Sequence, residues 1–406
     1  MGTHPPRPNG EWLSADQAAS QLGVRKATLY AYVSRGLLTA VADPQQPRCR
    51  RYPALEVEGL REGLRRHRPP ASPGMLYEGH PLVDTALTGM VDGVLVMGGQ
   101  PLTTWAEHAS VEDTAALLWH TSVAAAFGDP PPVLPALWHR TAADLREADP
   151  QCRAMALWSL ALPHLRGDLS LQGDALAAAL GAHLRVAFAC YLGQAPSDDP
   201  LHLQVAHAWA ITVPHHDAVR QSLVLCADIL GNLMSLSGRM LASLQGSLAA
   251  CLTATMSYGF VRLSGGEYEA VETLFDTVLE SGNPASVAAA YRSRGETLPG
   301  FNHHAFVHGD PRAAALLRMA DTLGSPAAHW IPLMQGSHLQ HPALDWSLVA
   351  LRRALGAPRH AAFSLMHMAR STGMLAQVVE QRQIDQRMWV TSRYVGPSPS
   401  RDNPPP

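Results

Sequence analysis

The sequence predicts a mainly α-helical protein in which a small N-terminal module precedes a large helical body. Ala- and Leu-rich segments at helical spacing fill most of residues 75–396, and β-branched alternation is scarce apart from residues 92–99. A chain of 406 residues is also too long for one small core. Prolines interrupt the helical pattern twice, so we expect a module over 1–66, a linker over 67–74 and a disordered tail over 397–406.

The composition is that of a globular protein, with 47% hydrophobic and 16% charged residues. By inspection, no apolar stretch approaches the roughly 18–20 residues needed to cross a bilayer, and the N-terminus lacks the apolar segment of a secretory signal. The five cysteines are far apart and form no CxxC pair. We therefore expect a cytoplasmic protein without membrane association, whose cysteines are free, buried thiols.

Charge is distributed unevenly along the chain. Residues 1–70 hold eleven Lys/Arg against six Asp/Glu, whereas the remainder holds 20 basic and 28 acidic residues. A small basic module on a large acidic body is typical of an appendage that binds nucleic acid.

Residues 13–38 carry the most specific local pattern in the chain. Ser14 and Gln17 have the spacing of a capping box, which predicts a helix that starts there and runs to Leu22. Gly23 supplies the turn, and a second helix is expected from about Arg25 to Gly36. The two helices, followed by residues 47–64, resemble excisionase-type or MerR-type winged helix-turn-helix modules.

This resemblance implies DNA binding by the second helix and by the basic stretch after it. Leu29 and Val33 would pack on the first helix, leaving polar and basic groups to face a major groove. The expected DNA-binding residues are Arg25, Lys26, Thr28, Tyr32, Arg35, Arg50 and Arg51. A helical cap that binds protein remains the alternative. One such module would contact few phosphates, so useful DNA affinity would require a dimer.

Generic catalytic and metal motifs do not occur. The sequence contains no GxSxG, P-loop, HExxH or dinucleotide fingerprint. Twenty histidines suggest a metal site, yet pairs such as His215 and His216 lack a further ligand at suitable spacing. We therefore expect scattered imidazoles and no metal site.

Four segments occur in the order and approximate spacing of the citrate synthase family. They are LVDTALTGMVDGVLVMGGQPLTTWAEHASVEDTAALLW (82–119), LVLCADILGNLMSLSGRMLAS (223–243), LPGFNHHAFVHGDPRAAALLRMA (298–320), and HPALDWSLVALRRALG (341–356) followed by MARSTGMLAQVVEQ (368–381). Together they make residues 75–396 similar to that family. The resemblance implies a two-domain helical fold with a small domain at about 265–350, a site in the cleft between the domains, and a homodimer.

The family's chemistry is the condensation of an acyl-CoA with oxaloacetate or a related 2-oxo acid, a step of the tricarboxylic acid cycle when the product is citrate. An aspartate removes the weakly acidic α-proton of the thioester while hydrogen-bond donors stabilise the enol. Arginines bind the carboxylates of the acceptor. The acyl-CoA is a substrate, and no cofactor is implied.

Four residues match the family's active-site motifs. By resemblance, Asp345 is the catalytic base and His303 polarises the ketone. Arg312, in DPRA, and Arg370 would bind substrate carboxylates. If the fold is that of the family, these residues converge on one pocket for an anionic carbonyl compound.

Other positions depart from the family pattern. Ser264 stands where the enol-stabilising histidine is expected, and we assign that catalytic role to its hydroxyl. Ile229 replaces a histidine that binds oxaloacetate. Trp389 and Thr391 replace arginines, and the family's glycine before the catalytic histidine becomes Asn302, with His304 following His303. Ile229 would suit a 2-oxo acid with one carboxylate and an apolar end better than oxaloacetate.

Three functional hypotheses follow. The first, which we favour, is a condensing acyltransferase that uses acetyl-CoA or propionyl-CoA. Under this hypothesis the replaced residues either reduce the condensing activity or abolish it. The second is a metabolite sensor that regulates transcription by binding DNA through the N-terminal module. The third is a structural subunit that forms a heterodimer with a complete homologue.

Overall fold

A computed structural model describes most of the chain. The described residues are 12–34, 38–43, 46, 49–54, 56–57, 83–165, 167, 169–301, 305–306, 308–335, 341–384 and 387–388. Among them, the residues up to Val83 belong to one compact unit, here called the head, and those from Asp84 to Met388 belong to a second unit, the body. Each unit is described by itself.

The head contains two helices and a three-stranded antiparallel sheet. Its strands and helices are β1 (Trp12–Ser14), α1 (Ala15–Leu22), α2 (Lys26–Ser34), β2 (Val41–Ala42) and β3 (Arg50–Pro53). The sheet has the order β1-β3-β2, so the first strand pairs with the last. The described head has its own core, made of Leu13, Ala18, Ala19, Leu29, Leu38, Tyr52 and Val57.

The ends of the first head helix agree with the sequence analysis. The Ser14 hydroxyl accepts from the backbone N–H of Gln17, and the Gln17 side chain accepts from the N–H of Ser14. Gly23 ends the helix in the left-handed region, with φ of 66°. The head's membership in a winged DNA-binding family stays a prediction.

The body begins with a small antiparallel sheet. It contains β4 (Thr88–Val91), β5 (Val94–Met97) and β6 (Gln100–Pro101), in the order β4-β5-β6. Asp92 and Gly93, with φ of 49° and 80°, form the two-residue turn between the first two strands. Asp-Gly is a preferred pair for such a turn, which explains the strand pattern expected near residues 92–99.

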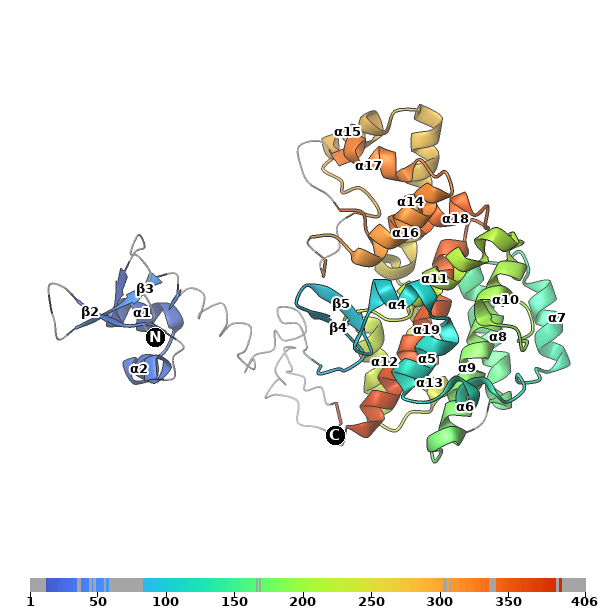
Figure 1. The fold of residues 1–406 in the computed structure, drawn as a ribbon, viewed down its shortest axis with the longest axis horizontal. Coiled ribbons are helices and arrows are strands. Elements are labelled where there is room, and N and C mark those ends of the chain that lie inside the picture. The colour runs from blue at the N-terminus through green and yellow to red at the C-terminus, as the bar shows by residue number, and fades with distance from the viewer. Residues whose placement is uncertain are drawn as a thin grey trace, which may run out of the picture. The chain divides into compact units, whose positions relative to one another are not determined.

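The rest of the body is helical (Figure 1). Its α-helices are α4 (Leu102–His108), α5 (Val111–Trp119), α6 (Val123–Phe127), α7 (Ala136–Asp144), α8 (Pro150–Ala161), α9 (Gly173–Leu192), α10 (Leu201–Ala208), α11 (His216–Cys226), α12 (Leu233–Ser243), α13 (Leu248–Met256), α14 (Arg262–Ser281), α15 (Pro284–Ser293), α16 (Pro311–Thr322), α17 (Ala327–Gln335), α18 (Leu344–Ala354) and α19 (Ala361–Gln383). Short 3-10 helices cover Leu162–His164, Val213–His215 and Ser257–Phe260.

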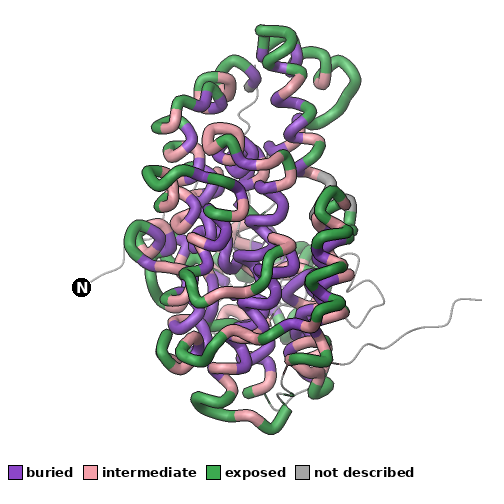
Figure 2. Tube along the Cα trace, turned by 90° about the vertical axis from the view of Figure 1, so that its right-hand side faces the viewer, coloured by how far each residue is buried: buried purple, intermediate pink, exposed green. Residues whose placement is uncertain are grey.

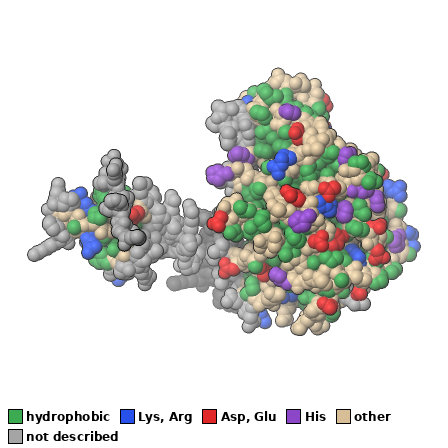
Figure 3. Space-filling model, in the orientation of Figure 1, with side chains coloured by type: hydrophobic (Ala, Val, Ile, Leu, Met, Phe, Trp, Pro, Cys, Tyr) green, Lys and Arg blue, Asp and Glu red, His purple; other side chains and the backbone are tan. Residues whose placement is uncertain are grey.

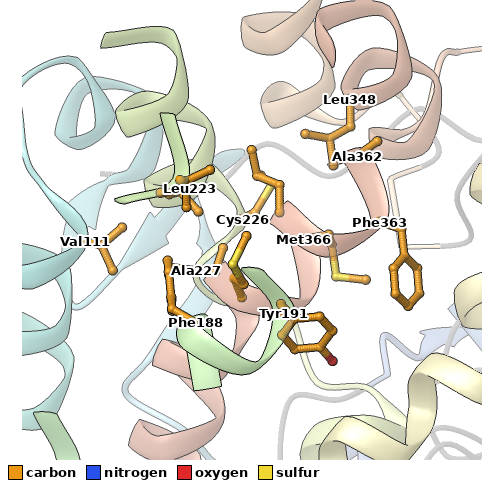
Figure 4. Packing of buried hydrophobic residues seen from close by; sticks show 14 of the residues in the cluster. Val111, Phe188, Tyr191, Leu223, Cys226, Ala227, Leu348, Ala362, Phe363 and Met366 are labelled. Carbon is orange, nitrogen blue, oxygen red and sulfur yellow. The ribbon is translucent and has the colours of Figure 1, made fainter. Parts of the chain in front are cut away.

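Helix α19 forms the centre of the body. It is buried along almost its whole length and packs against α5, α9, α11, α12 and α13. In Figure 2 the buried part of the trace runs through the middle of the body, with exposed segments around it. Figure 4 shows Phe363 and Met366 of this helix in the same buried cluster as Tyr191 and Cys226 from neighbouring helices. This packing brings side chains that are distant in sequence around one helix.

Helices α14 to α18 lie together at one end of the body (Figure 1). They pack on one another in the pairs α14–α15, α14–α18, α15–α17, α16–α17 and α16–α18. This group covers the region in which a small domain was expected, about 265–350. The domain boundaries themselves stay predictions.

Two sequence expectations need correction. Helix α9 is long and apolar enough to span a bilayer, with a mean hydropathy of 1.5, although the sequence analysis found no such stretch. Because 72% of that apolar window is buried inside the body, α9 has the character of a core helix. The five cysteines lie among the described residues and form no disulfide there, but Cys49 and Cys152 are exposed rather than buried.

The second family-like segment, 223–243, spans a break between two helices. Helix α11 ends at Cys226 and α12 starts at Leu233, where the Asn232 side chain caps the new helix by accepting from the N–H of Ser235 at 2.9 Å. The chain between the two helices passes through Asp228, which is fully buried. A helix break therefore places a carboxylate inside the body.

Candidate active site

Asp345, the expected catalytic base, lies in the first turn of α18 and is partly buried. Burial raises the pKa of its carboxyl group to about 6, although a hydrogen bond from Tyr268 opposes the shift. The charge of Glu267 raises this pKa further, whereas that of Arg312 lowers it. A carboxylate with a pKa near neutrality suits a general base.

Arg370, in the middle of α19, is 4% exposed. Its Nη1 has no hydrogen-bond partner among the described residues. Burial lowers the pKa of its guanidinium group, and the nearby charge of Arg312 acts in the same direction. Since a buried, unpaired donor on a charged group is unfavourable, Arg370 is suited to receive an anionic ligand.

Arg312 is placed differently from Arg370, because its hydrogen-bond donors are already engaged. Its Nη2 and Nε donate to the Asp310 carboxylate at 2.7 and 3.0 Å, and Nη1 donates to the Asp228 carbonyl at 3.4 Å. The guanidinium also lies 5.2 Å from the centre of the Phe306 ring. In this arrangement Arg312 is paired with Asp310, and it acts on the site mainly through its positive charge.

Asp228 is a functional candidate that the sequence analysis did not select. Its carboxylate accepts from Thr88 Oγ1 at 2.7 Å and from Gln377 Nε2 at 3.2 Å. Burial raises the pKa of Asp228, whereas the charge of Arg370 lowers it. The signal was present in the second family-like segment, where Asp228 directly precedes the substituted Ile229.

Three of the four expected residues converge. The charges of Arg312, Arg370 and Asp345 all act on the thiol of Cys226, at the end of α11, whose pKa burial raises to about 11. Figure 4 shows Cys226 in the core between α11 and α19. Because α11, α16, α18 and α19 supply these groups, the site is assembled from segments far apart in sequence.

Most of the other residues compared with the family pattern lie outside the described part of the chain. His303 lies outside the described residues, as do Asn302, His304, Trp389 and Thr391. Ser264 belongs to α14, but its side chain is outside the description. Ile229 is partly buried next to Asp228. The proposed roles of His303 and Ser264 therefore stay predictions.

Two further buried groups adjoin the cluster. Tyr268 of α14 is 5% exposed, and its ring meets Phe363 edge-on at 6.2 Å. His367 of α19 stacks on Tyr191, and its Nε2 has no partner among the described residues. Burial lowers the pKa of His367 to about 3, so this imidazole is neutral at physiological pH. No family motif had singled out either residue.

The expected DNA-binding residues of the head differ in their exposure to solvent. Arg25, Thr28 and Arg50 are exposed, and the exposed Lys26 pairs with Asp16 at 2.7 Å. Two other residues differ from expectation. Tyr32 packs partly against the head core, and the neighbouring Tyr30 is 51% exposed in its place. Arg51 is partly buried and paired with Asp43 at 2.7 Å. Arg35 lies outside the described residues.

No cluster of three or more His, Cys, Asp or Glu side chains suited to a metal ion occurs within the described ranges. Figure 3 shows histidines scattered over the visible face of the body rather than gathered in one place. A cavity of about 400 Å³ lies apart from the Asp345 cluster, with Trp138, Arg153 and His360 in its wall. Arg153 donates from its two terminal nitrogens to the carbonyls of Arg146 and Tyr191, and its Nε has no partner among the described residues.

Comparison with known proteins places the body in a defined group. The family model of the citrate synthase C-terminal domain matches residues 74–392. A putative citrate synthase 2 of Mycobacterium tuberculosis is 26% identical over 213 residues, covering 50% of this chain and 53% of that protein. A 2-methylcitrate synthase of the same organism is 26% identical over 191 residues, covering 44% and 48%. The chain thus spans about half the length of the curated relatives it matches.

Solved structures share the fold at low sequence identity. Citrate synthase from Thermoplasma acidophilum, determined as a ternary complex with carboxymethyl coenzyme A and oxaloacetate, has a TM-score of 0.68 at 20% identity, covering 82% of this chain and 98% of that one. Citrate synthase from Thermotoga maritima has a TM-score of 0.64 at 18% identity, covering 80% and 96%. These likenesses concern the fold alone.

Proposed function

Because the chain belongs to the citrate synthase family, we propose that its body condenses an acyl-CoA with a 2-oxo acid and releases CoA. One observation carries the proposal. A carboxyl group with a pKa of about 6, that of Asp345, acts on the same buried thiol, Cys226, as Arg370, whose buried Nη1 has no hydrogen-bond partner among the described residues. The pair combines a base for proton transfer with a receptor for an anion.

The proposed reaction uses these groups in sequence. The Asp345 carboxylate takes a proton from the α-carbon of the acyl thioester, and the resulting enol carbon attacks the ketone carbon of the 2-oxo acid. The new alkoxide takes up a proton, and water then cleaves the thioester to give a carboxylate and free CoA thiol. Arg370 holds a carboxylate of the acceptor, while His303 and Ser264 polarise the two carbonyl groups by resemblance to the family.

The proposed acceptor is a 2-oxo acid with one carboxylate and an apolar end. Ile229 supports this choice, because its aliphatic side chain stands next to Asp228, where the family has a histidine that binds oxaloacetate. The Asp310 contacts of Arg312 support it as well, since they leave Arg370 as the principal receptor for a carboxylate. Oxaloacetate, with its second carboxylate, would lack a matching partner.

A thiol-release assay tests the proposal. Acetyl-CoA and propionyl-CoA are each combined with a panel of 2-oxo acids that includes oxaloacetate, pyruvate and longer apolar analogues, and free CoA thiol is followed with a thiol-reactive dye. We expect release that Asp345→Ala lowers at least about a hundredfold, because the base is removed. Release by the intact chain no greater than that of Asp345→Ala, with every acid in the panel, would contradict the proposal.

We also propose that the body acts as a homodimer through α12. Leu233, Met240 and Leu244 recur at helical spacing on and just after this helix, and they are 64%, 37% and 55% exposed. Exposed apolar side chains on one helical face are typical of a protein interface. Light scattering of the intact chain and of Met240→Glu checks this point, since a charge at an interface should favour monomers.

A second candidate function is ligand-controlled DNA binding through the head. It is favoured by the head's own core and by the exposed Arg25, Thr28 and Arg50. The test is retention of genomic DNA fragments by the intact chain at low salt, with and without an acyl-CoA and a 2-oxo acid. Sequence-selective retention that changes with ligand is expected, and its absence at low salt would reject this function.

A further inference from the structure

The cavity of about 400 Å³ lies where α7, α8, α9 and α10 meet the segment that joins α18 to α19. Trp138 of α7, Arg153 of α8 and Trp209 at the end of α10 are in its wall. None of the described residues in this wall belongs to the candidate active site, so the proposed condensation gives the cavity no role. Its volume is within the range of about 300–1,000 Å³ that is usual for small-molecule sites.

Arg153 brings a buried positive charge to this wall. It is 6% exposed, and its terminal nitrogens donate to the carbonyls of Arg146 and Tyr191 at 2.9 and 2.7 Å. Its Nε has no hydrogen-bond partner among the described residues. The charges of Asp149 and Glu147 act on it from the exposed surface, but neither side chain lines the cavity. Since a buried charge without a counterion is unfavourable, the cavity is suited to an anion.

The other polar side chains of the wall are basic or neutral. Arg146, His139 and Gln194 are exposed, and His360 is partly buried. No Asp or Glu is among the described residues that line the cavity. Burial and the charge of Arg153 lower the pKa of His360, as expected where two basic groups share a space without an anion. The wall therefore offers positive charge and no negative charge to a ligand.

Apolar side chains form the rest of the wall. Trp138 is fully buried, Trp209 is 9% exposed, and Leu192 and Ala142 lie beside them. Indole rings offer broad, flat apolar surfaces on which another ring can stack. A ligand that fills this cavity therefore needs a flat apolar body as well as an anionic group.

Gly193 leaves the space beside Arg153 open. It ends α9 in the left-handed region, with φ of 68°, and it lies in the cavity wall. The nearest atoms to an added Cβ would all belong to Arg153, with Cδ and Nε at 3.4 Å and Cζ at 3.8 Å. A side chain at this position would take up space directly beside the guanidinium group.

The cavity also adjoins the connection between α18 and α19. Pro358 and His360 of this connection line the cavity. Arg359, between them, pairs with Glu269 and Asp276 of α14 at 2.8 and 2.7 Å. A ligand in the cavity therefore contacts the segment that ties α14 to the start of α19.

We propose that this cavity is a second ligand site of the body, which binds a small carboxylate that carries an aromatic ring. The carboxylate compensates the charge of Arg153, and the ring lies against Trp138 and Trp209. The inference goes beyond the proposed condensation. It does not depend on that reaction, because no group of the candidate active site takes part.

Calorimetric titration of the intact chain with phenylacetate and with indole-3-acetate tests the proposal. Each acid is compared with its neutral amide and with inorganic phosphate, an anion that has no ring. We expect at least one acid to bind about tenfold more tightly than its amide and than phosphate. Equal affinity for acid and amide, tighter binding of phosphate, or no binding of either acid would overturn the proposal.

Arg370→Gln separates this cavity from the candidate active site. The variant removes the expected receptor for the carboxylate of the 2-oxo acid, so binding of the aromatic acid should stay unchanged. Binding that disappears in Arg370→Gln would assign the acid to the active site and contradict a second site. Because binding is the readout, the result holds whether or not the chain condenses any acid.

Arg153→Met has a matched control in Arg185→Met. Arg185 of α9 is also buried, and its terminal nitrogens donate to the carbonyls of Asp129 and Phe127 at 2.7 and 3.0 Å, but it is not in the cavity wall. Each variant removes a buried guanidinium group that binds two carbonyls. Arg153→Met should weaken binding of the acid about tenfold, to the affinity of the amide, whereas Arg185→Met should not. Equal binding by the two variants would count against the proposal.

Gly193→Ala covers the case in which Arg153→Met does not fold. Its matched control is Gly282→Ala, because Gly282 ends α14 with a similar φ of 64° and nothing lies within 4 Å of its added Cβ. Both variants place alanine in the left-handed region, but only the methyl group of Gly193→Ala occupies cavity space. We expect Gly193→Ala to weaken binding of the acid at least about threefold and Gly282→Ala to leave it unchanged. Unchanged binding in Gly193→Ala would rule out the cavity as the site.

Discussion

Burial disfavours the charged form of both Asp345 and Arg370. It raises the pKa of the carboxyl group and lowers that of the guanidinium group, so both charged forms are disfavoured in the folded body. A site of this kind is less stable without ligand than a neutral core would be, and binding of an anion relieves part of the penalty at Arg370.

Replacing Asp345 by Asn should therefore stabilise the body while abolishing condensation. The folded-state pKa of about 6 lies above the ordinary value of an aspartate, 3.8, so Asp345 contributes most favourably below pH 3.8 and this contribution is lost as the pH rises through 6. At pH 7.5 we expect a gain on the order of 2 kcal/mol in the free energy of unfolding. Urea denaturation checks it at pH 7.5 and at pH 3.8, where the gain should vanish. Equal stability of both proteins at pH 7.5 would contradict the assignment of burial as the cause.

His367 should have the opposite dependence on pH. Its folded-state pKa of about 3 lies below the ordinary value of a histidine, 6.5, so the neutral imidazole is compatible with the fold above pH 6.5 and stability is lost as the pH falls from 6.5 towards 3. His367→Gln should show a shallower loss of stability between pH 6.5 and 4 in urea denaturation. The control is His164→Gln, at an exposed histidine, and it should keep the slope of the unchanged chain.

At the scale of the helices, the close approach of α11 and α19 builds the site. The N–H of Gly373 donates to the carbonyl of Ala227 at 2.9 Å, just where α11 has ended. The same break places Asp228 beside Gln377 and within the field of Arg370. The glycine on α19 thus permits a backbone contact that locates a buried carboxylate.

Gly373→Ala should disrupt this crossing. An added Cβ would lie 2.5 Å from the Ala227 carbonyl oxygen and 2.6 Å from Asp228 Oδ1, too close for either to remain in place. We expect a loss of about 2–3 kcal/mol in the free energy of unfolding, measured with urea. Gly89→Ala is the matched control, because nothing lies within 4 Å of its added Cβ. A Gly373→Ala variant as stable as this control would show that the helices can separate without penalty.

At the scale of the whole chain, the head and the body have separate hydrophobic cores. Among the described residues, the head core contains seven buried hydrophobic side chains, far fewer than the body core, so it has much less apolar area to stabilise it. Two units with cores of such different size are expected to unfold in separate steps.

Leu29→Ala should therefore lower only the first of two thermal transitions. Leu29 is fully buried in the head core, and its truncation should remove about 2–4 kcal/mol from that unit. Calorimetry of the intact chain measures both transitions, and a 2-oxo acid with one carboxylate and an apolar end should raise only the one that belongs to the body. A single transition that Leu29→Ala shifts as a whole would refute the independence of the two units.

The sequence by itself determined the class of fold, the family of the body and the ends of several elements. Local signals suffice for such features, because a capping box at Ser14 or an Asp-Gly turn at residue 92 acts over a few residues. The order of the family-like motifs was enough to select Asp345, Arg312 and Arg370. In the fold, the charges of all three act on the thiol of Cys226.

Only the tertiary structure decided what these side chains can do. The contact of Arg312 with the Asp228 carbonyl, and the lack of a partner for Arg370 Nη1 among the described residues, depend on segments that are far apart in sequence. The break after Cys226 and the inward position of Tyr32 likewise follow from packing, which overrides helical periodicity. Burial and donor pairing are properties of the assembled core, so no local pattern encodes them.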